Sequence, residues 1–254
     1  MSQLLALTDL PLGQFSIVVI AVFVAGMVRG FSGFALSALV MASVALIIPP
    51  IQLIPVCWVL ELAASLLMVR GGFKEGNFKV ALGLVVGTAV GAPIGLYLTN
   101  TLPVETSKLI ALSVVLLLAA LQLLRVRATF LATRPGLYIS GLFAGIATGL
   151  ASVGGMVVAL YVLARDAPSR EMRGSLVMYL FMSSFMSAIY LLLYGMFDKT
   201  ALARGLIMAV PCLLGVVIGK ALFVPRLEAY YKPFCLGLLM LLAGFGIVRL
   251  ASGL

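Results

Sequence analysis

The chain contains no histidine and few charged residues, and both absences narrow its possible functions. Lys, Arg, Asp and Glu make up 10% of the 254 residues, against about 25% in soluble domains. Without histidine, histidine-based catalysis, metal binding and proton relay are excluded. The cysteines Cys57, Cys212 and Cys235 stand apart in apolar runs, without the spacing of metal ligands or of a disulfide framework. We therefore expect no metal and no cofactor.

Long apolar runs take the place of charge. Hydrophobic residues make up 63% of the chain, more than one soluble core of this size buries. We therefore expect an all-α polytopic membrane protein with one domain over residues 1–254. The net charge of +9 does not indicate nucleic-acid binding, because Lys and Arg lie in short loops between apolar runs. No basic region precedes the first apolar run, so we expect no cleaved signal peptide.

Eight apolar runs are of two kinds. Six have the ~20 residues of one membrane-spanning helix and cover residues 50–69, 79–98, 106–124, 173–194, 202–223 and 232–250. Two are longer and are interrupted by glycine-rich breaks, 15–48 at residues 29–33 and 136–165 at residues 148–155. Each half of the first holds about 14 residues, or ~21 Å of helix, and the hydrocarbon core is ~30 Å thick. We expect both to form re-entrant hairpins.

The distribution of loop charge favours hairpins over single crossings. If both broken runs return to the side where they start, one side receives Arg70, Lys74, Lys79, Arg125, Arg127, Arg134, Arg165, Arg170, Arg173, Lys220, Arg226 and Lys232, and the other receives Lys108, Lys199, Arg204 and Arg249. Single crossings would nearly even out the two sides. Basic loops face the cytoplasm, so we expect both termini on the periplasmic side. Ten short spans would give the same sidedness and stay an alternative.

The two halves of the chain, residues 15–125 and 136–250, resemble each other. Ala25-Gly26-x-x-x-Gly30 matches Ala144-Gly145-x-x-x-Gly149, and the glycine pair 91 and 95 matches the pair 215 and 219. We assign these last four glycines to helix packing. Each half is a hairpin followed by three spans, an odd number, so the second half enters the membrane inverted. Inverted repeats are typical of secondary transporters, with the substrate near the midplane. The alternative is a duplicated scaffold.

The two breaks are the first candidate substrate site. A helix that starts after each break, near Phe34 and near Gly155, would offer free N–H groups and a positive dipole end to an anion. The predicted substrate-binding residues are Arg29, Gly30, Phe31, Ser32 and Gly33 at the first tip and Thr148, Gly149, Ser152, Gly154 and Gly155 at the second. Arg29 would pair with an oxyanion, or alternatively extend its side chain to water.

Two spans carry further candidates. Glu61 is an acidic residue in the middle of a span. It would neutralise Arg29 or, because burial disfavours a charged carboxylate, carry a proton; a plain interhelical hydrogen bond is a third reading. Trp58, one turn earlier, would wall the cavity or face lipid. Ser183 and Ser184 would line the cavity opposite Glu61 or bond neighbouring helices.

These motifs resemble a known family. Gly-Phe-Ser-Gly-Phe (30–34), Gly-Leu-Ala-Ser-Val-Gly-Gly (149–155), the following Arg-Asp-Ala-Pro-x-Arg loop and the Ser-rich span resemble the TauE/SafE sulfite exporters, also called toluenesulfonate uptake permeases. The resemblance implies a carrier of small sulfur-containing anions (sulfite, sulfoacetate or another organosulfonate) in the bacterial inner membrane. An inside-negative potential favours anion export, by about 2.3 kcal/mol per charge per 100 mV. The sequence leaves the oligomeric state open.

Other function classes fit less well. An intramembrane enzyme would need a nucleophile and a base, and no Ser–Lys or Asp–Asp pair lies inside the spans, so we expect no enzyme. An anion channel and a membrane scaffold without transport remain as alternatives.

Overall fold

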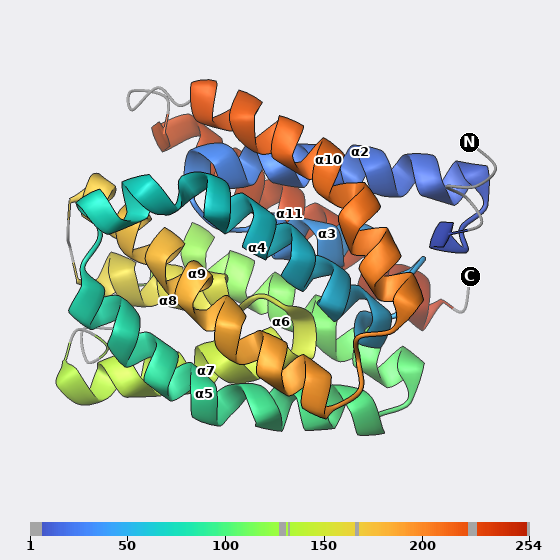
Figure 1. Ribbon diagram of the computed structural model, residues 1–254, viewed down its shortest axis with the longest axis horizontal. Coiled ribbons are helices and arrows are strands. Elements are labelled where there is room, and N and C mark those ends of the chain that lie inside the picture. The colour runs from blue at the N-terminus through green and yellow to red at the C-terminus, as the bar shows by residue number, and fades with distance from the viewer. Residues whose placement is uncertain (1–6, 127–130, 132, 166–167, 223–227, 253–254) are drawn as a thin grey trace.

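The computed structural model describes residues 7–126, 131, 133–165, 168–222 and 228–252, and α-helices account for nearly all of them (Figure 1). The helices are α2 (Leu12–Ser32), α3 (Leu36–Val44), α4 (Pro50–Glu75), α5 (Phe78–Thr101), α6 (Val104–Leu123), α7 (Arg134–Ala151), α8 (Gly154–Ala164), α9 (Ser169–Leu193), α10 (Lys199–Ala221) and α11 (Glu228–Ala251). Arg127 and Arg226, counted among the loop charges above, lie outside the described residues.

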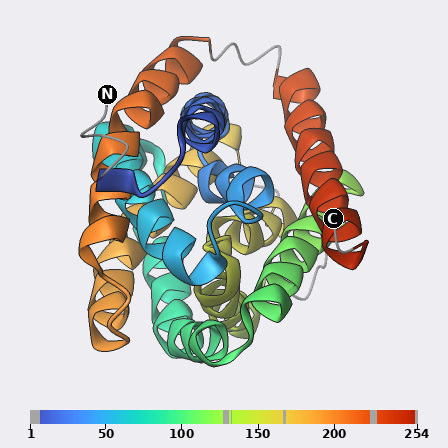
Figure 2. The same cartoon turned by 90° about the vertical axis from the view of Figure 1, so that its right-hand side faces the viewer.

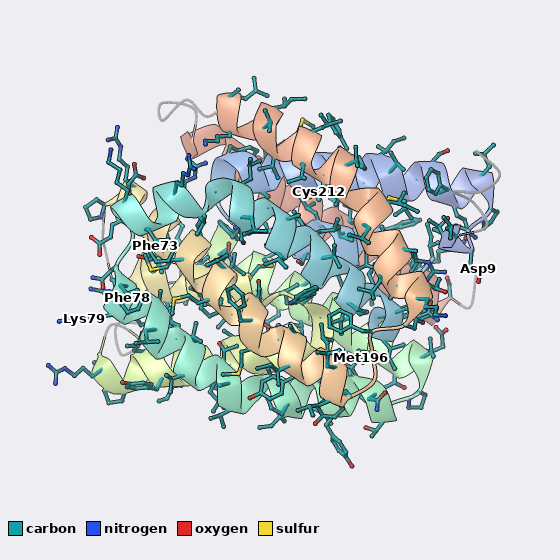
Figure 3. The ribbon with its side chains drawn as sticks, in the orientation of Figure 1. Asp9, Phe73, Phe78, Lys79, Met196 and Cys212 are labelled. Atoms are coloured by element: carbon teal, nitrogen blue, oxygen red, sulfur yellow. The ribbon has the colours of Figure 1, made fainter. Side chains whose placement is uncertain are left out.

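The prediction of a polytopic membrane protein is confirmed. Among the described residues, seven helices are long and apolar enough to cross a membrane, and six of them, α4, α5, α6, α9, α10 and α11, are the six predicted spans. Large apolar side chains project from their outer faces (Figure 3). On α5, for example, Val86, Val90 and Ile94 follow one another at helical spacing and are 50, 61 and 47% exposed. Such a stripe is suited to lipid.

The expected division of the first broken run into two equal short halves is wrong. Helix α2 continues through Arg29 to Ser32 and is 21 residues long, the seventh candidate span. The break falls at Gly33 and Ala35, whose φ angles of 82° and 72° are left-handed, and α3 has only 9 residues. A single glycine costs a helix about 1 kcal/mol, which does not end it, and Gly30 lies where α2 approaches the α10 backbone.

The second broken run has the same unequal division. Helix α7 is 18 residues long and includes Thr148 and Gly149, and α8 has 11 residues. The break is confined to Ser152, with a left-handed φ of 57°, and Val153. At ~1.5 Å per residue, α8 is about 16 Å long, too short to cross a bilayer.

Both broken runs fold back on themselves. In Figure 1, α2 and α4 begin at the same end of the molecule, and α7 and α9 both begin at the opposite end. Lys79 lies at this second end and Asp9 at the first (Figure 3). Helix α11 ends at the end where α2 begins. This arrangement is in keeping with the predicted hairpins.

Helices pack across the two halves of the chain in corresponding pairs: α2 on α10, α7 on α5, α4 on α9 and α6 on α11 (Figures 1 and 2). Glycines hold the first two pairs together. A Cβ on Gly26 would lie 2.3 Å from the Cys212 carbonyl oxygen of α10, and one on Gly91 2.0 Å from the Leu142 carbonyl oxygen of α7. The glycines of the repeated motif thus let two backbones touch. The inverted relation of the halves stays a prediction.

Candidate functional site

A cavity opens between α4, α5, α9 and the second break. Its empty volume is about 540 Å³, open solvent at its mouth included. It is lined by Ile54, Trp58, Glu61, Ala92, Leu96, Thr148, Ser152, Gly154, Gly155, Leu180, Ser183, Ser184, Ser187 and Leu191. We call it the outer cavity, because all of its α4 residues and all but one of its α9 residues lie in the halves of those helices nearer the start of α2.

The opposite halves of α4 and α9 are closed against each other. A Cβ on Gly174 would lie 2.5 Å from the backbone nitrogen of Gly76. The backbone N–H of Asn77 donates to Ser175 Oγ at 2.9 Å. Arg173 donates to the Gly30 carbonyl at the end of α2. The end of the molecule that holds the Arg-rich loops is therefore sealed where the outer cavity stops.

The second break presents the start of a helix to the outer cavity. The first N–H groups of a helix have no partner within it, and in α8 these belong to Gly154 and Gly155, which line the cavity. A Cβ on Gly154 would lie 2.1 Å from Thr148 Oγ1 and 2.5 Å from the Ala144 carbonyl oxygen, and because the second atom belongs to the backbone, only glycine fits between α8 and α7. The positive dipole end of α8 thus points at the cavity.

Hydroxyl groups surround this helix start. Thr148 Oγ1 donates to the Ala144 carbonyl at 2.7 Å, and Ser183 and Ser184 donate to the Leu180 carbonyl at 3.2 and 2.6 Å. Each would have to rotate from its own helix to donate to a ligand. Ser152 and Ser187 also line the cavity, and no hydrogen bond to another described side chain holds their hydroxyls. Polar donors for an anion are therefore present at the helix start.

Trp58 fixes one wall of the outer cavity. Its Nε1 donates to the Ser184 carbonyl at 2.8 Å, and its ring meets Phe197 edge-on with centroids 5.0 Å apart. Both contacts bridge α4 to α9 and the segment that follows it. Trp58 is thus held in place beside the serines.

A smaller inner cavity, with an empty volume of about 180 Å³, lies between the two breaks. It is lined by Ala35, Ser37, Ala38, Glu61, Ser152, Val153, Gly155, Met156 and Leu180. The starts of α3 and α8 both face it, so two positive helix ends converge on one space. Glu61, Ser152, Gly155 and Leu180 border both cavities. The two breaks, distant in sequence, therefore meet.

Arg29 lies behind Glu61 and not in either cavity. Its side chain is completely buried, and its Nε is 3.3 Å from Glu61 Oε2, whose side chain is 12% exposed. It also donates to Ser65 Oγ at 3.0 Å and to the Gly33 carbonyl. Glu61 Oε1 accepts from the N–H and Oγ of Ser37, at 3.3 and 2.9 Å. Arg29 is thus neutralised by Glu61 and does not reach water.

The predicted site residues divide into two groups. Trp58, Glu61, Thr148, Ser152, Gly154, Gly155, Ser183 and Ser184 line the outer cavity. Arg29, Gly30, Phe31, Ser32, Gly33 and Gly149 line neither cavity. Gly30 and Gly149 lie in helix contacts, against the Val216 carbonyl of α10 and the Leu96 N–H of α5. The prediction that the first break begins at Arg29 is wrong, because α2 stays helical through Ser32.

Sequence reasoning missed Ser37, Ser65 and Leu180. Ser37 and Ser65 hold Glu61 and Arg29, and Leu180 borders both cavities. Ser37 lies in the first turn of α3, directly after the first break, a position typical of anion donors. Nothing in the sequence distinguishes Leu180 from its apolar neighbours.

The charges at the site come to zero. Glu61 is the charged residue of the outer cavity lining, and Arg29 offsets it. An entering anion therefore meets helix ends and hydroxyls without a net repulsive charge. Among the described residues, no cluster of three acidic or cysteine side chains could hold a metal ion.

A family model described as "Sulfite exporter TauE/SafE" matches residues 18–246. No curated protein and no solved structure matches the chain.

Proposed function

Because the chain belongs to the TauE/SafE family of sulfite exporters, we propose that it is a secondary transporter that moves sulfite or a small organosulfonate out of the cell. Family membership makes it a multi-pass membrane transporter of small sulfur-containing anions, and no enzymatic activity is expected.

One observation carries the proposal: the outer and inner cavities meet at the start of α8, opposite the start of α3. Free N–H groups and a positive dipole end bind anions, and sulfite and sulfonate offer several oxygens to such donors. The hydroxyls of Ser152, Ser183, Ser184 and Thr148 add further donors. The apolar walls beside Trp58 suit the carbon group of a sulfonate.

The arrangement supports alternating access. The outer cavity lies toward the end where α2 begins, and the Gly76–Gly174 contact closes the other end. We propose that the closed, Arg-rich end is cytoplasmic and that both termini are periplasmic. The described state would then face the periplasm of a bacterial inner membrane. The two repeats would then move so that the closed end opens while the outer cavity closes, around a fixed site. The membrane potential would favour export.

The test is transport by the purified protein in proteoliposomes. Vesicles loaded with radiolabelled sulfite, or with each of a short panel of sulfonates, are assayed for efflux under an applied potential. Gly155→Val places a branched side chain in the site, where even a Cβ would lie 3.3 Å from Leu180. Gly244→Val on α11, where a Cβ meets nothing within 4 Å, is the matched control.

We expect efflux by wild type and by Gly244→Val, and strong loss by Gly155→Val. Equal efflux by both variants would remove the cavity from the transport path. No flux of any sulfur anion by folded wild type would contradict the substrate class. In the alternative role of Glu61 as a proton carrier, Glu61→Gln would lose only the response to a pH gradient.

A further inference from the structure

The carboxylate of Glu61 is held in the way a bound oxyanion would be. One oxygen accepts from the Ser37 N–H at 3.3 Å and from Ser37 Oγ at 2.9 Å, in the first turn of α3. The other lies 3.3 Å from Arg29 Nε. A guanidinium, a helix start and a serine hydroxyl form a complete set of donors for a carboxylate, sulfite or sulfonate.

The Glu61 carboxylate does not use all of these donors. Arg29 Nε and Glu61 Oε2 are both buried, and neither makes an aligned hydrogen bond. The contact between them is therefore an ion pair without the directional bonds that a charged pair can form. A free oxyanion, not tethered to α4, can orient its oxygens to these donors better than Glu61 does.

We propose that Arg29, Ser37 and the start of α3 form an oxyanion subsite that the Glu61 carboxylate fills whenever the carrier is empty, and that the transported anion displaces it. This inference rests on the proposed transport function and adds a second half to its site. Glu61 borders both cavities, so the displaced side chain can turn into the outer cavity, and Arg29 lies directly behind it.

The tethered carboxylate has a consequence for the transport cycle. A buried arginine without a counter-ion is costly inside a membrane protein. With Glu61 in place, the empty subsite carries no net charge, and the empty carrier can reorient. Without it, the carrier can reorient only with a substrate anion bound. Glu61 is thus the residue that permits net transport instead of obligatory anion exchange.

The test compares net flux with exchange in Glu61→Gln. Proteoliposomes loaded with radiolabelled sulfite are placed in sulfite-free buffer for net efflux, or in buffer with unlabelled sulfite for exchange. We expect net efflux to fall by at least about tenfold and exchange to stay within about threefold of wild type. Glu105→Gln on α6, with an exposed side chain paired to Lys108, is the matched control and should behave as wild type.

A second measurement does not depend on flux. In detergent, sulfite, methanesulfonate and formate are added to each variant, and the unfolding temperature is recorded. Ligands that bind the folded state raise it. No tethered carboxylate competes with the anion in Glu61→Gln. The unfolding temperature of this variant should therefore rise more on addition of an anion than that of wild type. The double variant Arg29→Gln/Glu61→Gln, which lacks the guanidinium, should lose this gain.

Each result decides the inference. Wild-type net efflux by Glu61→Gln, or equal loss of efflux and exchange, would overturn it. The inference would also be overturned if the added anions raised the unfolding temperature of Glu61→Gln no more than that of wild type. This measurement applies even if wild type moves no sulfur anion. In that case the transport proposal fails separately. A larger stabilisation of Glu61→Gln that persists in the double variant would place the anion elsewhere.

Discussion

Gly91→Ala should loosen the contact between α5 and α7 that holds the second break in place. A Cβ on Gly91 would lie 2.0 Å from the Leu142 carbonyl oxygen, and ordinary contact begins at 3.4 Å. The helices must therefore separate locally by about 1.4 Å, because the opposing atom belongs to the backbone and cannot rotate away.

The change that Gly91→Ala makes to the free energy of unfolding is the difference between two opposing effects. Inserting a methyl group into a close-packed interface costs roughly 1–3 kcal/mol, and the backbone contact places this case near the upper end. Alanine gains up to about 1 kcal/mol over glycine in a helix. We expect a net loss of about 2 kcal/mol in the free energy of unfolding.

Gly244→Ala on α11 is the matched control. A Cβ there meets nothing within 4 Å, so only the helix gain of up to about 1 kcal/mol applies. The two substitutions are chemically identical and should change stability in opposite directions.

The assay is equilibrium unfolding in mixed detergent and SDS micelles. The chain has 1 tryptophan, and Trp58 lies at the outer cavity, so its fluorescence reports on this region. Circular dichroism gives helix content on the same samples. If Gly91→Ala were as stable as Gly244→Ala, the close approach of α5 and α7 would be wrong, and with it the position of the second break.

Three further substitutions test the site and its support. Asn77→Ala should lower the free energy of unfolding by about 1 kcal/mol, because Asn77 Oδ1 caps α5 by accepting from the Val80 N–H at 3.3 Å. Asn77→Ser, which like alanine loses the Nδ2–H bond to Glu171 Oε1 but keeps a capping oxygen, should lose less, and an equal loss would count against the cap. Gln122→Met should stay within about 1 kcal/mol of wild type, because it removes one hydrogen bond to the Met156 carbonyl and one buried acceptor without a partner. Gln122→Glu should unfold at lower denaturant than Gln122→Met, since it sets an oxygen against that carbonyl, and the reverse order would refute this reading. Trp58→Phe should raise the KM for the transported anion at little change in helix content, because it loses the bond to the Ser184 carbonyl and part of the ring that meets Phe197; an unchanged KM would show that Trp58 does not shape the site.

The six plain spans and the two broken runs could be predicted because hydropathy and glycine spacing are local properties of the chain. The packing role of Gly91, Gly95, Gly215 and Gly219 followed in the same way, and each lies against a neighbouring backbone. The exact breaks could not be predicted. Helix α2 runs through Gly30, because its contact with α10 outweighs the weak preference of one glycine for a turn.

The sequence alone determined that this is a membrane protein of a carrier family, with candidate anion donors at two breaks. Only the tertiary structure decided how they combine. In the structure, Arg29 lies behind Glu61, and the Glu61 carboxylate accepts a hydrogen bond from the start of α3. The start of α8 faces the cavity. The physical reason is that these partners lie on different helices. Their meeting depends on how each helix is rotated and how closely it packs, and an apolar pattern encodes neither for a helix that is apolar on every side.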